Sequence, residues 1–277
     1  MTDTFYTGVG NRKAPREALD LCREVGRELA LRGLTLRTGE DKGTAQEFHA
    51  GACDTPDGQV TVYRAKDVSL TRDAWAFDIA VRAVGSAAWL RYGHNERLLC
   101  ARSVMQVLGH DGRTPSRFLL CWLWSADPRM QDGTRVAARV ADDWANCRSA
   151  MPDGVIDVEL AGTLPVIPWL NLKGLTLADA LAFAHQHAGV PVLRPGDVLP
   201  ARLVPEGTLY SRARHTQHAV KLDGQFWRVS DDQGLWYPAN SAADHVPSEV
   251  TIVSLGWTRE KINPRALERS ALAYWNA

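Results

Sequence analysis

The sequence contains no apolar run that approaches the ~20 residues needed for a membrane-spanning helix. Its first residues, MTDTFYTGVGNRK, lack the basic segment and apolar stretch that form a signal peptide. It also lacks an excess of charge of either sign, because Lys and Arg together number 32 and so do Asp and Glu. This balance gives no general electrostatic preference for nucleic acids or membranes. We therefore expect a soluble, cytoplasmic protein with no membrane partner.

Cysteine is sparse, and the five residues lie far apart at Cys22, Cys53, Cys100, Cys121 and Cys147. No two of them form a Cys-x-x-Cys pair. An odd, dispersed set is typical of reduced thiols rather than of a disulfide framework or a zinc site. We expect no metal and no resident cofactor.

Hydrophobic periodicity in the first 65 residues predicts alternating strands and helices. Strands are expected at residues 5–8, 34–37 and 60–64, and helices at residues 18–32 and 45–52. This strand–helix order is typical of a parallel sheet whose strands are joined by crossover helices.

The alternation continues to about residue 190. The most apolar run of the chain, RFLLCWLW at residues 117–124, predicts a strand buried on both faces. Thr176 and Asp179 are spaced as a capping box at a helix start. Further helices are expected at residues 74–89, 97–108, 133–143 and 176–187, and short strands at residues 155–160 and 164–167.

The composition changes after Gly189, where prolines at positions 191, 195, 200 and 205 suggest a linker or an irregular connection. Residues 219–229 predict two strands joined at Asp223-Gly224, a hairpin turn signal. A strand at 250–255 and a helix at 265–275 follow. The sequence thus predicts an α/β fold. Residues 1–190 form a Rossmann-like, mostly parallel sheet with flanking helices, and residues 191–277 form a small β-rich module.

Three glycine-containing turns each follow a predicted strand and open a predicted helix. The carboxyl ends of parallel strands share one edge of the sheet, and ligands of open α/β folds bind at that edge. Glycine lets the main chain approach a phosphate, which main-chain amides and arginine side chains then neutralise. The candidate phosphate- or nucleotide-binding residues of these turns are Gly8, Gly10, Asn11, Arg12, Gly39, Lys42, Gly43, Thr44, Gly133, Thr134 and Arg135.

Several segments together resemble a known superfamily. They are YTGVGNRKAP, LALRGLTLRTGEDKGTAQEFHAGA, LLCARSVMQVLG, RFLLCWLW with QDGTRVAARVA, and LPVIPWLNL. Over about residues 5–175 the chain is similar to the Rossmann-like superfamily of DNA-processing protein A and the lysine-decarboxylase-like proteins. That superfamily includes the nucleotide-sensing SLOG domains and the LOG-type nucleotide phosphoribohydrolases, and many phage-encoded proteins resemble it. The resemblance implies nucleotide or DNA binding, with Arg102 contacting the phosphate.

The chain departs from this pattern where the family's catalytic and acidic residues stand. Asn11 replaces the family's serine in the first turn, and Ala45 stands where an acidic residue is usual. Ser103 replaces the asparagine after the helix arginine, and Ala137 matches the catalytic glutamate of the phosphoribohydrolases. Without that carboxylate, nothing obvious at that position would activate water or stabilise an oxocarbenium-like transition state. The resemblance therefore favours ligand binding over that hydrolysis.

Three functions follow as hypotheses. The first is binding of a nucleotide, a nucleotide-derived small molecule or a phosphate of single-stranded DNA. The second is a hydrolase or transferase acting on an N-glycosidic or phosphoribosyl bond, with Glu40, Asp41 or Glu47 as the acid/base. The third is a partner-binding protein whose C-terminal module makes the contact. Self-association is left open.

The C-terminal segment HTQHAVKLDGQFWRVSDD places His215, His218 and Asp231 around the predicted hairpin. It resembles the His–Asp half of papain-like and transglutaminase-like folds, in which the acid orients a histidine that activates a cysteine. No cysteine follows Cys147 to provide that nucleophile. The plainer interpretation is a small hairpin module that carries histidines.

Overall fold

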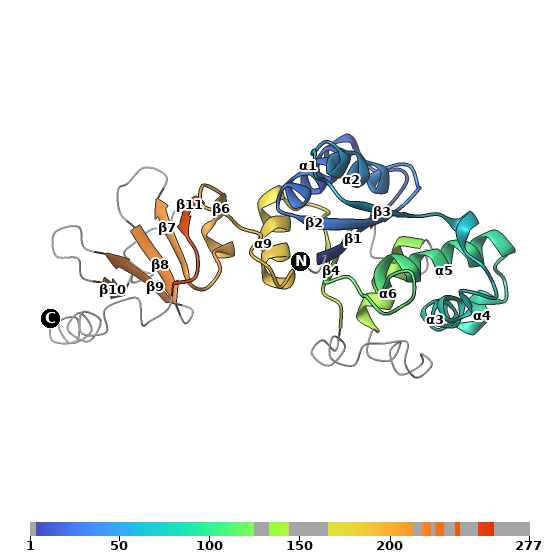
Figure 1. Ribbon diagram of the computed structural model, residues 1–277. Coiled ribbons are helices and arrows are strands. Elements are labelled where there is room, and N and C mark those ends of the chain that lie inside the picture. Colours follow the sequence, from blue (N-terminus) through green and yellow to red (C-terminus); the bar gives the residue numbers. More distant parts are fainter. Residues whose placement is uncertain are drawn as a thin grey trace. The chain divides into compact units, whose positions relative to one another are not determined.

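The computed structural model describes residues 4–124, 133–143, 166–212, 218–222, 225–229, 236–238 and 249–257. Contacts divide the chain into two units, Met1–Val190 and Pro191–Ala277 (Figure 1). The division falls at the first proline of the proline-containing stretch. The expected strand at 155–160 and the expected helix at 265–275 lie outside the described residues.

The first unit is built on a five-stranded sheet in the order β3-β2-β1-β4-β5, and every neighbouring pair is parallel. This confirms the predicted α/β fold with a parallel sheet. The strands are β1 (Thr4–Gly10), β2 (Leu34–Gly39), β3 (Val60–Tyr63), β4 (Phe118–Trp122) and β5 (Trp169–Asn171).

Helices cover both faces of this sheet (Figure 1). One face carries α1 (Arg16–Leu31), α2 (Thr44–Cys53) and α9 (Leu177–His187). The other face carries α3 (Ala74–Val84), α5 (His94–Leu108) and α6 (Gly133–Asp142). The predicted capping box at the start of α9 is confirmed, because Thr176 and Asp179 exchange side-chain and main-chain hydrogen bonds.

Strand β4 shows why the sheet needs both helical layers, since all five of its residues are buried. Phe118 packs on the face that carries α1, α2 and α9. Its ring centroid lies 5.6 Å from that of Tyr6 and 6.0 Å from that of Phe183 of α9. Leu119 and Cys121 point to the opposite layer and join the core made with α3, α5 and α6. Burying an apolar side chain of this size stabilises the fold by about 1.5–3 kcal/mol. The apolar run expected from the sequence is confirmed as a buried strand between β1 and β5.

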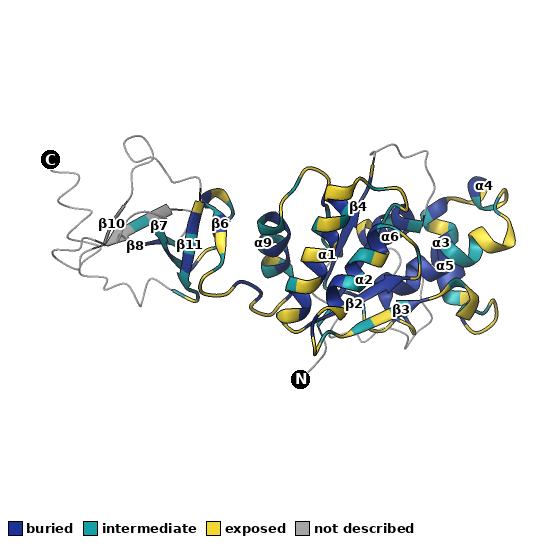
Figure 2. Ribbon diagram, turned by 90° about the horizontal axis from the view of Figure 1, so that it is seen from above, coloured by how far each residue is buried: buried dark blue, intermediate teal, exposed yellow. Residues whose placement is uncertain are grey.

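The second half of helix α5 is deeply enclosed, and residues 100–108 are all buried (Figure 2). Its buried surface includes the polar side chains of Arg102, Ser103 and Gln106. Ser103 Oγ donates to the Leu99 carbonyl over 2.9 Å, and the Gln106 carbonyl accepts from Thr7 Oγ1 over 2.8 Å. Polar groups on this helix are therefore held inside the first unit rather than on its surface.

Two predicted elements of the first unit differ from the structure. The helix expected at 74–89 is interrupted at Gly85, whose φ of 90° ends α3 and precedes the short helix α4 (Ser86–Trp89). Half of the strand expected at 164–167 lies outside the described residues, the described residues 166 and 167 are not in a strand, and β5 begins at Trp169. Pro168 has no N–H to give to the sheet, and its carbonyl accepts from Leu119 just before the strand starts.

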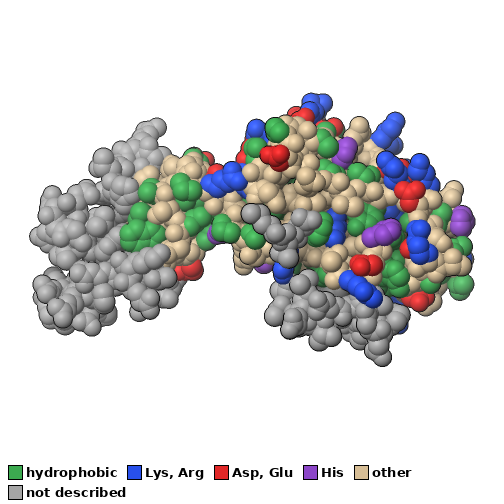
Figure 3. Space-filling model, viewed as in Figure 1, with side chains coloured by type: hydrophobic (Ala, Val, Ile, Leu, Met, Phe, Trp, Pro, Cys, Tyr) green, Lys and Arg blue, Asp and Glu red, His purple; other side chains and the backbone are tan. Residues whose placement is uncertain are grey.

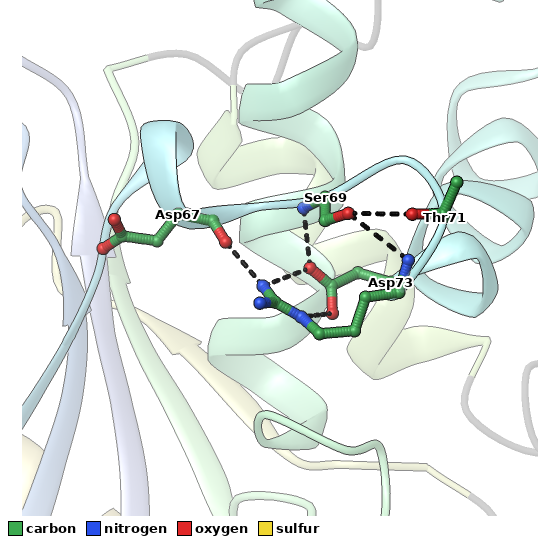
Figure 4. Close-up of polar contacts among 5 residues, drawn as sticks. Asp67, Ser69, Thr71 and Asp73 are labelled. Carbon is green, nitrogen blue, oxygen red and sulfur yellow. Dashed lines mark hydrogen bonds and ion pairs between the residues drawn. The ribbon is translucent and has the colours of Figure 1, made fainter.

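The connection from β3 to α3 contains the short 3₁₀ helix η1 (Ala65–Asp67) and a closed polar network (Figure 4). Asp73, 2 % exposed, accepts from the Ser69 main-chain N–H over 2.7 Å and from Arg72 Nε over 3.0 Å. Arg72 also donates to the Asp67 main-chain carbonyl over 2.6 Å, and Thr71 contacts Ser69. Burial acts to raise the pKa of Asp73, but the hydrogen bonds from Arg72 and Ser69 outweigh it and the pKa is lowered.

The second unit is a six-stranded sheet in the order β10-β9-β8-β7-β11-β6, with every pair antiparallel. The predicted hairpin is confirmed as β8 and β9, and the predicted strand near 250 as β11. Strands β6, β7 and β10 were not expected. The elements are β6 (Val198–Pro200), η2 (Ala201–Leu203), β7 (Thr208–Arg212), β8 (His218–Leu222), β9 (Gln225–Val229), β10 (Trp236–Pro238) and β11 (Glu249–Ser254).

Within the described residues, no helix is both long enough and apolar enough to cross a bilayer. On the part of the first unit that is drawn in colour in Figure 3, Lys and Arg side chains alternate with Asp and Glu side chains. Side chains of both charge signs are therefore present on this part of the surface.

We predict that Asp73→Asn lowers the free energy of unfolding by about 1–3 kcal/mol, because it removes a buried carboxylate that accepts hydrogen bonds from the Ser69 N–H and from Arg72. The folded pKa of Asp73 lies below the unfolded value of about 3.9. Its stabilisation is therefore complete above that value and is lost as the pH falls through the folded pKa. Urea unfolding at pH 7 and at successively lower pH should show the difference between wild type and variant shrinking in acid.

Asp67→Asn is the matched control for that measurement. Asp67 enters the network through its main-chain carbonyl, which the substitution leaves in place. The control should change the unfolding free energy by less than about 0.5 kcal/mol. Equal losses for the two variants would contradict the assignment of Asp73 as the residue that holds this loop.

Candidate functional site

The strand order creates a switch point between β1 and β4. From β1 the chain builds β2 and β3 on one side, and it then returns to place β4 and β5 on the other. Ligands of open α/β sheets bind at such a point, outside the carboxyl ends of the strands. A cavity of about 460 Å³ lies there, which is within the range of small-molecule sites. It is lined by Val9, Gly10, Asn11, Arg12, Lys13, Asp41, Ala45, Tyr92, Glu96, Leu99, Cys100, Arg102, Gln106, Gly133 and Thr134.

The structure brings the three predicted turns to this one edge. The first turn contributes Gly10, Asn11 and Arg12, the second contributes Asp41, and the third contributes Gly133 and Thr134 at the start of α6. The first and the third of these turns are more than 120 residues apart in the sequence. Their convergence follows from the parallel sheet, which places the ends of β1, β2 and β4 side by side.

The first and second turns are in direct contact, and Gly10 makes this contact close. A Cβ at Gly10 would lie 2.9 Å from the Trp122 carbonyl oxygen and would overlap the Thr44 side chain. The Asn11 N–H donates to that Trp122 carbonyl over 3.2 Å, and the Thr44 N–H donates to the Asn11 carbonyl over 3.4 Å. The glycine is therefore required because two turns and a strand end meet around it.

These hydrogen bonds correct part of the sequence interpretation. The amides of Asn11 and Thr44 were expected to face a phosphate, but both are used within the protein to hold the turns together. The first N–H groups of a helix have no partner inside that helix. At this edge they belong to Gly133 and Thr134 of α6. Positive charge in the cavity thus comes mainly from side chains and from the start of α6.

The central interaction of the cavity is a carboxylate held between two arginines. One oxygen of Asp41 lies 2.7 Å from Arg12 Nη2, and the other lies 2.6 Å from Arg102 Nη2. The Arg12 side chain is 67 % exposed, whereas that of Arg102 is only 5 % exposed. Arg102 is therefore an internal cation, and Arg12 is an exposed one.

Arg102 keeps unused hydrogen-bonding capacity. Its Nε and Nη1 atoms are buried and have no hydrogen-bond partner among the described residues. The guanidinium packs against Gly39, where a Cβ would lie 3.1 Å from Nη1 and 2.7 Å from Gln106 Nε2. A buried charge is costly unless it is paired, and removing the partner of a buried ion pair typically costs about 3–5 kcal/mol. Arg102 accordingly needs an anion beside it.

Asp41 is an ionised partner rather than a proton donor. Burial acts to raise its pKa, but the charges and hydrogen bonds of Arg102 and Arg12 together lower the pKa below its ordinary value. A general acid needs a proton near neutral pH. The environment of Asp41 therefore does not suit the acid role, although its carboxylate is well suited to organise the two arginines.

The lining that comes from the α4–α5 region, here called the Tyr92 wall, carries aromatic and apolar side chains. Tyr92 lies after α4 and packs at the edge of the hydrophobic core, with its ring centroid 6.2 Å from that of Trp89. Leu99 and Cys100 of α5 continue this wall. Burial raises the pKa of the Cys100 thiol to about 12, so it is uncharged at neutral pH. Glu96, on the same helix, accepts from the Gly93 N–H over 2.7 Å.

Eight of the predicted site residues lie outside the cavity lining. Gly8 packs under Leu36 and Phe48, where a Cβ would lie 2.9 Å and 3.0 Å from their side chains, so its role there is close packing. Glu40 is exposed, and Glu47 faces Arg23 of α1 at 3.9 Å. The others outside the lining are Gly39, Lys42, Gly43, Thr44 and Arg135.

Eight lining residues were not predicted as site residues, and four of them have charged, amide or phenol side chains: Lys13, Tyr92, Glu96 and Gln106. Lys13 directly follows the first turn, so its position next to Arg12 in the sequence could have indicated that it lines the cavity. The other three come from the α4–α5 region, which carries no glycine turn of its own. Among the described residues, no group of three or more His, Cys, Asp or Glu is arranged to hold a metal ion.

Comparison with known proteins gave no match: no family model, no curated protein and no solved structure is similar to the chain. The resemblance to the DNA-processing protein A and lysine-decarboxylase-like superfamily thus stays a prediction. His215 and Asp231 lie outside the described residues, and His218 pairs with Ser211 through the β7–β8 ladder. The resemblance to papain-like folds also stays a prediction.

We predict that Gly10→Ala destabilises the first unit by about 1–3 kcal/mol, because the added methyl overlaps a carbonyl and a side chain in a well-packed contact. Gly93→Ala is the control, since a Cβ there would meet only Glu96 Oε2, at 3.6 Å. Urea unfolding should separate the two variants clearly. A Gly10 variant as stable as the Gly93 variant would contradict the close meeting of the turns.

Proposed function

We propose that the first unit binds a nucleotide, with its phosphate at the arginine end of the cavity and its nucleoside against the Tyr92 wall. The observation that carries this proposal is the position of Arg102. It is a nearly fully buried cation with unused donors, and it lines a cavity of about 460 Å³ at the switch point of a parallel sheet. Perturbed, partnered charges in such a cavity favour a binding site over a structural pair.

The phosphate end has the features of an anion site. Arg12 and Arg102 converge on one point from two different elements, and Lys13 adds a third cation at the lining. The start of α6 contributes main-chain N–H groups and the positive end of the helix dipole. Guanidinium groups recognise phosphate through paired hydrogen bonds, so this end suits a phosphoryl group better than a neutral one.

The Tyr92 wall suits a flat, partly polar group. Tyr92 offers an aromatic surface and Leu99 an aliphatic one, and Glu96 supplies a carboxylate acceptor on the same side. A base or ribose can pack against the first two residues and donate a hydrogen bond to the third. The cavity thus combines an anionic subsite with an apolar one, as a nucleotide requires.

Arg102→Met should weaken binding of a nucleoside 5′-monophosphate at least about tenfold, because it removes the buried cation while keeping a long side chain. Arg16→Met is the control, since it removes the same charge from an exposed position on α1 paired only with Asp20. Isothermal titration calorimetry on both variants, with circular dichroism to check folding, measures the effect. Unchanged affinity in a folded Arg102 variant would rule out the proposed phosphate end.

Tyr92→Leu tests the nucleoside end separately. Loss of an aromatic stacking surface typically weakens base binding by about 1–3 kcal/mol. The affinity for inorganic phosphate should stay the same, because the proposal assigns Tyr92 to the nucleoside and the arginines to the phosphate. Parallel titrations with a nucleoside monophosphate and with phosphate distinguish the two ends, and an equal loss for both probes would show that Tyr92 does not act on the nucleoside.

A further inference from the structure

The Asp41 carboxylate lies where a ligand's anion would have to lie. Its two oxygens take up one guanidinium nitrogen each, from Arg12 at 2.7 Å and from Arg102 at 2.6 Å. A phosphate oxygen pair would use the same donors in the same way. The protein therefore supplies its own anion to the subsite when no ligand is bound.

The two sides of this interaction differ in how firmly they are held. Arg102 is 5 % exposed and is packed against Gly39 and Gln106 inside α5 and β2. Asp41 belongs to a short connection between β2 and α2, and both of its chain neighbours, Glu40 and Lys42, are exposed. If one partner moves away, it is the carboxylate, because the guanidinium is 5 % exposed and is packed against Gly39.

We propose that Asp41 is a built-in competitor, whose carboxylate occupies the phosphate position on Arg102 and Arg12 and is displaced by the ligand's phosphate. This inference rests on the proposed nucleotide-binding function and adds a selection rule to it. The exchange keeps Arg102 paired in both states, so no buried cation is left alone at any stage.

The selection follows from counting charge. When a singly charged group, such as a carboxylate or a phosphodiester, replaces Asp41, one negative charge takes the place of another. The electrostatic free energy gained by that exchange is small. A terminal phosphate monoester carries nearly two negative charges at neutral pH and three acceptor oxygens, so its exchange is favourable. The other charged groups at the cavity, Lys13 and Glu96, oppose each other in sign. Asp41 thus imposes the same cost on every ligand, and the more highly charged monoester of a free nucleotide exceeds that cost more readily than the phosphodiester backbone of single-stranded DNA.

The test is Asp41→Asn, which removes the charge and keeps the shape. Calorimetric titrations at pH 8 use a nucleoside 5′-monophosphate and the methyl phosphodiester of the same nucleotide. We expect the variant to bind both probes at least about tenfold more tightly than wild type, by the same factor. Glu40→Gln removes the same charge from the exposed neighbouring position and should change either affinity less than about twofold.

Each outcome decides between the alternatives. Unchanged or weaker binding by Asp41→Asn, with wild type binding the monophosphate, overturns the competitor role and leaves the proposed function standing. A clearly larger gain for the monoester than for the diester shows that Asp41 stays in place and repels the ligand, which overturns displacement. If neither wild type nor Asp41→Asn binds either probe, the proposed function itself fails. Binding by the variant alone supports the competitor role.

A second measurement covers a variant that is too unstable to titrate. Without Asp41, Arg102 needs an anion from solution, so inorganic phosphate should raise the Tm of Asp41→Asn more than that of wild type or Glu40→Gln. Chloride at equal ionic strength is the comparison. Equal increases for all three proteins would overturn the proposal, because phosphate would then not be replacing the missing carboxylate.

Discussion

The pairing of Arg102 with Asp41 is the constraint around which the first unit is arranged. A guanidinium that is 5 % exposed needs a negative partner, and the structure brings that partner from a different strand end. Gly39 leaves space for the guanidinium, and the buried segment of α5 fixes it in position. Both side chains of this pair line the cavity, so the cavity carries charged groups. Stability of the fold and readiness for an anion thus depend on one side chain.

The sheet topology explains why this pair lies at a site rather than within a uniform core. The order β3-β2-β1-β4-β5 reverses the direction of chain building next to β1, and this leaves an opening between the helices that follow β1 and β4. The turns around Gly10 close on one another through main-chain hydrogen bonds. Their amides serve the architecture, so the proposed function assigns ligand recognition to arginine side chains and to the start of α6.

The candidate site was predictable in part, and the parts differ in their physical basis. Arg12 and Gly133 were indicated because glycine turns after parallel strands always share one edge. Asp41 was expected as an acid or base, yet its contacts with two arginines favour an ionised, pairing role. Glu47 was grouped with it because the two are close in sequence, but a helix turn directs Glu47 toward Arg23. Tyr92 and Glu96 had no local signal, since only packing of α5 brings them to the cavity.

In the first unit, sequence alone determined the alternation of strands and helices up to β3, the buried central strand and the parallel sheet, because periodicity and apolar runs are local properties that survive into the fold. It also determined the hairpin of β8 and β9 in the second unit. Only the tertiary structure decided that Gly85 breaks a helix, that Pro168 delays β5 and that Asp41 joins Arg12 to Arg102. Such features depend on which distant groups meet, and the pairing of charges across more than sixty residues leaves no trace in the pattern of any single segment.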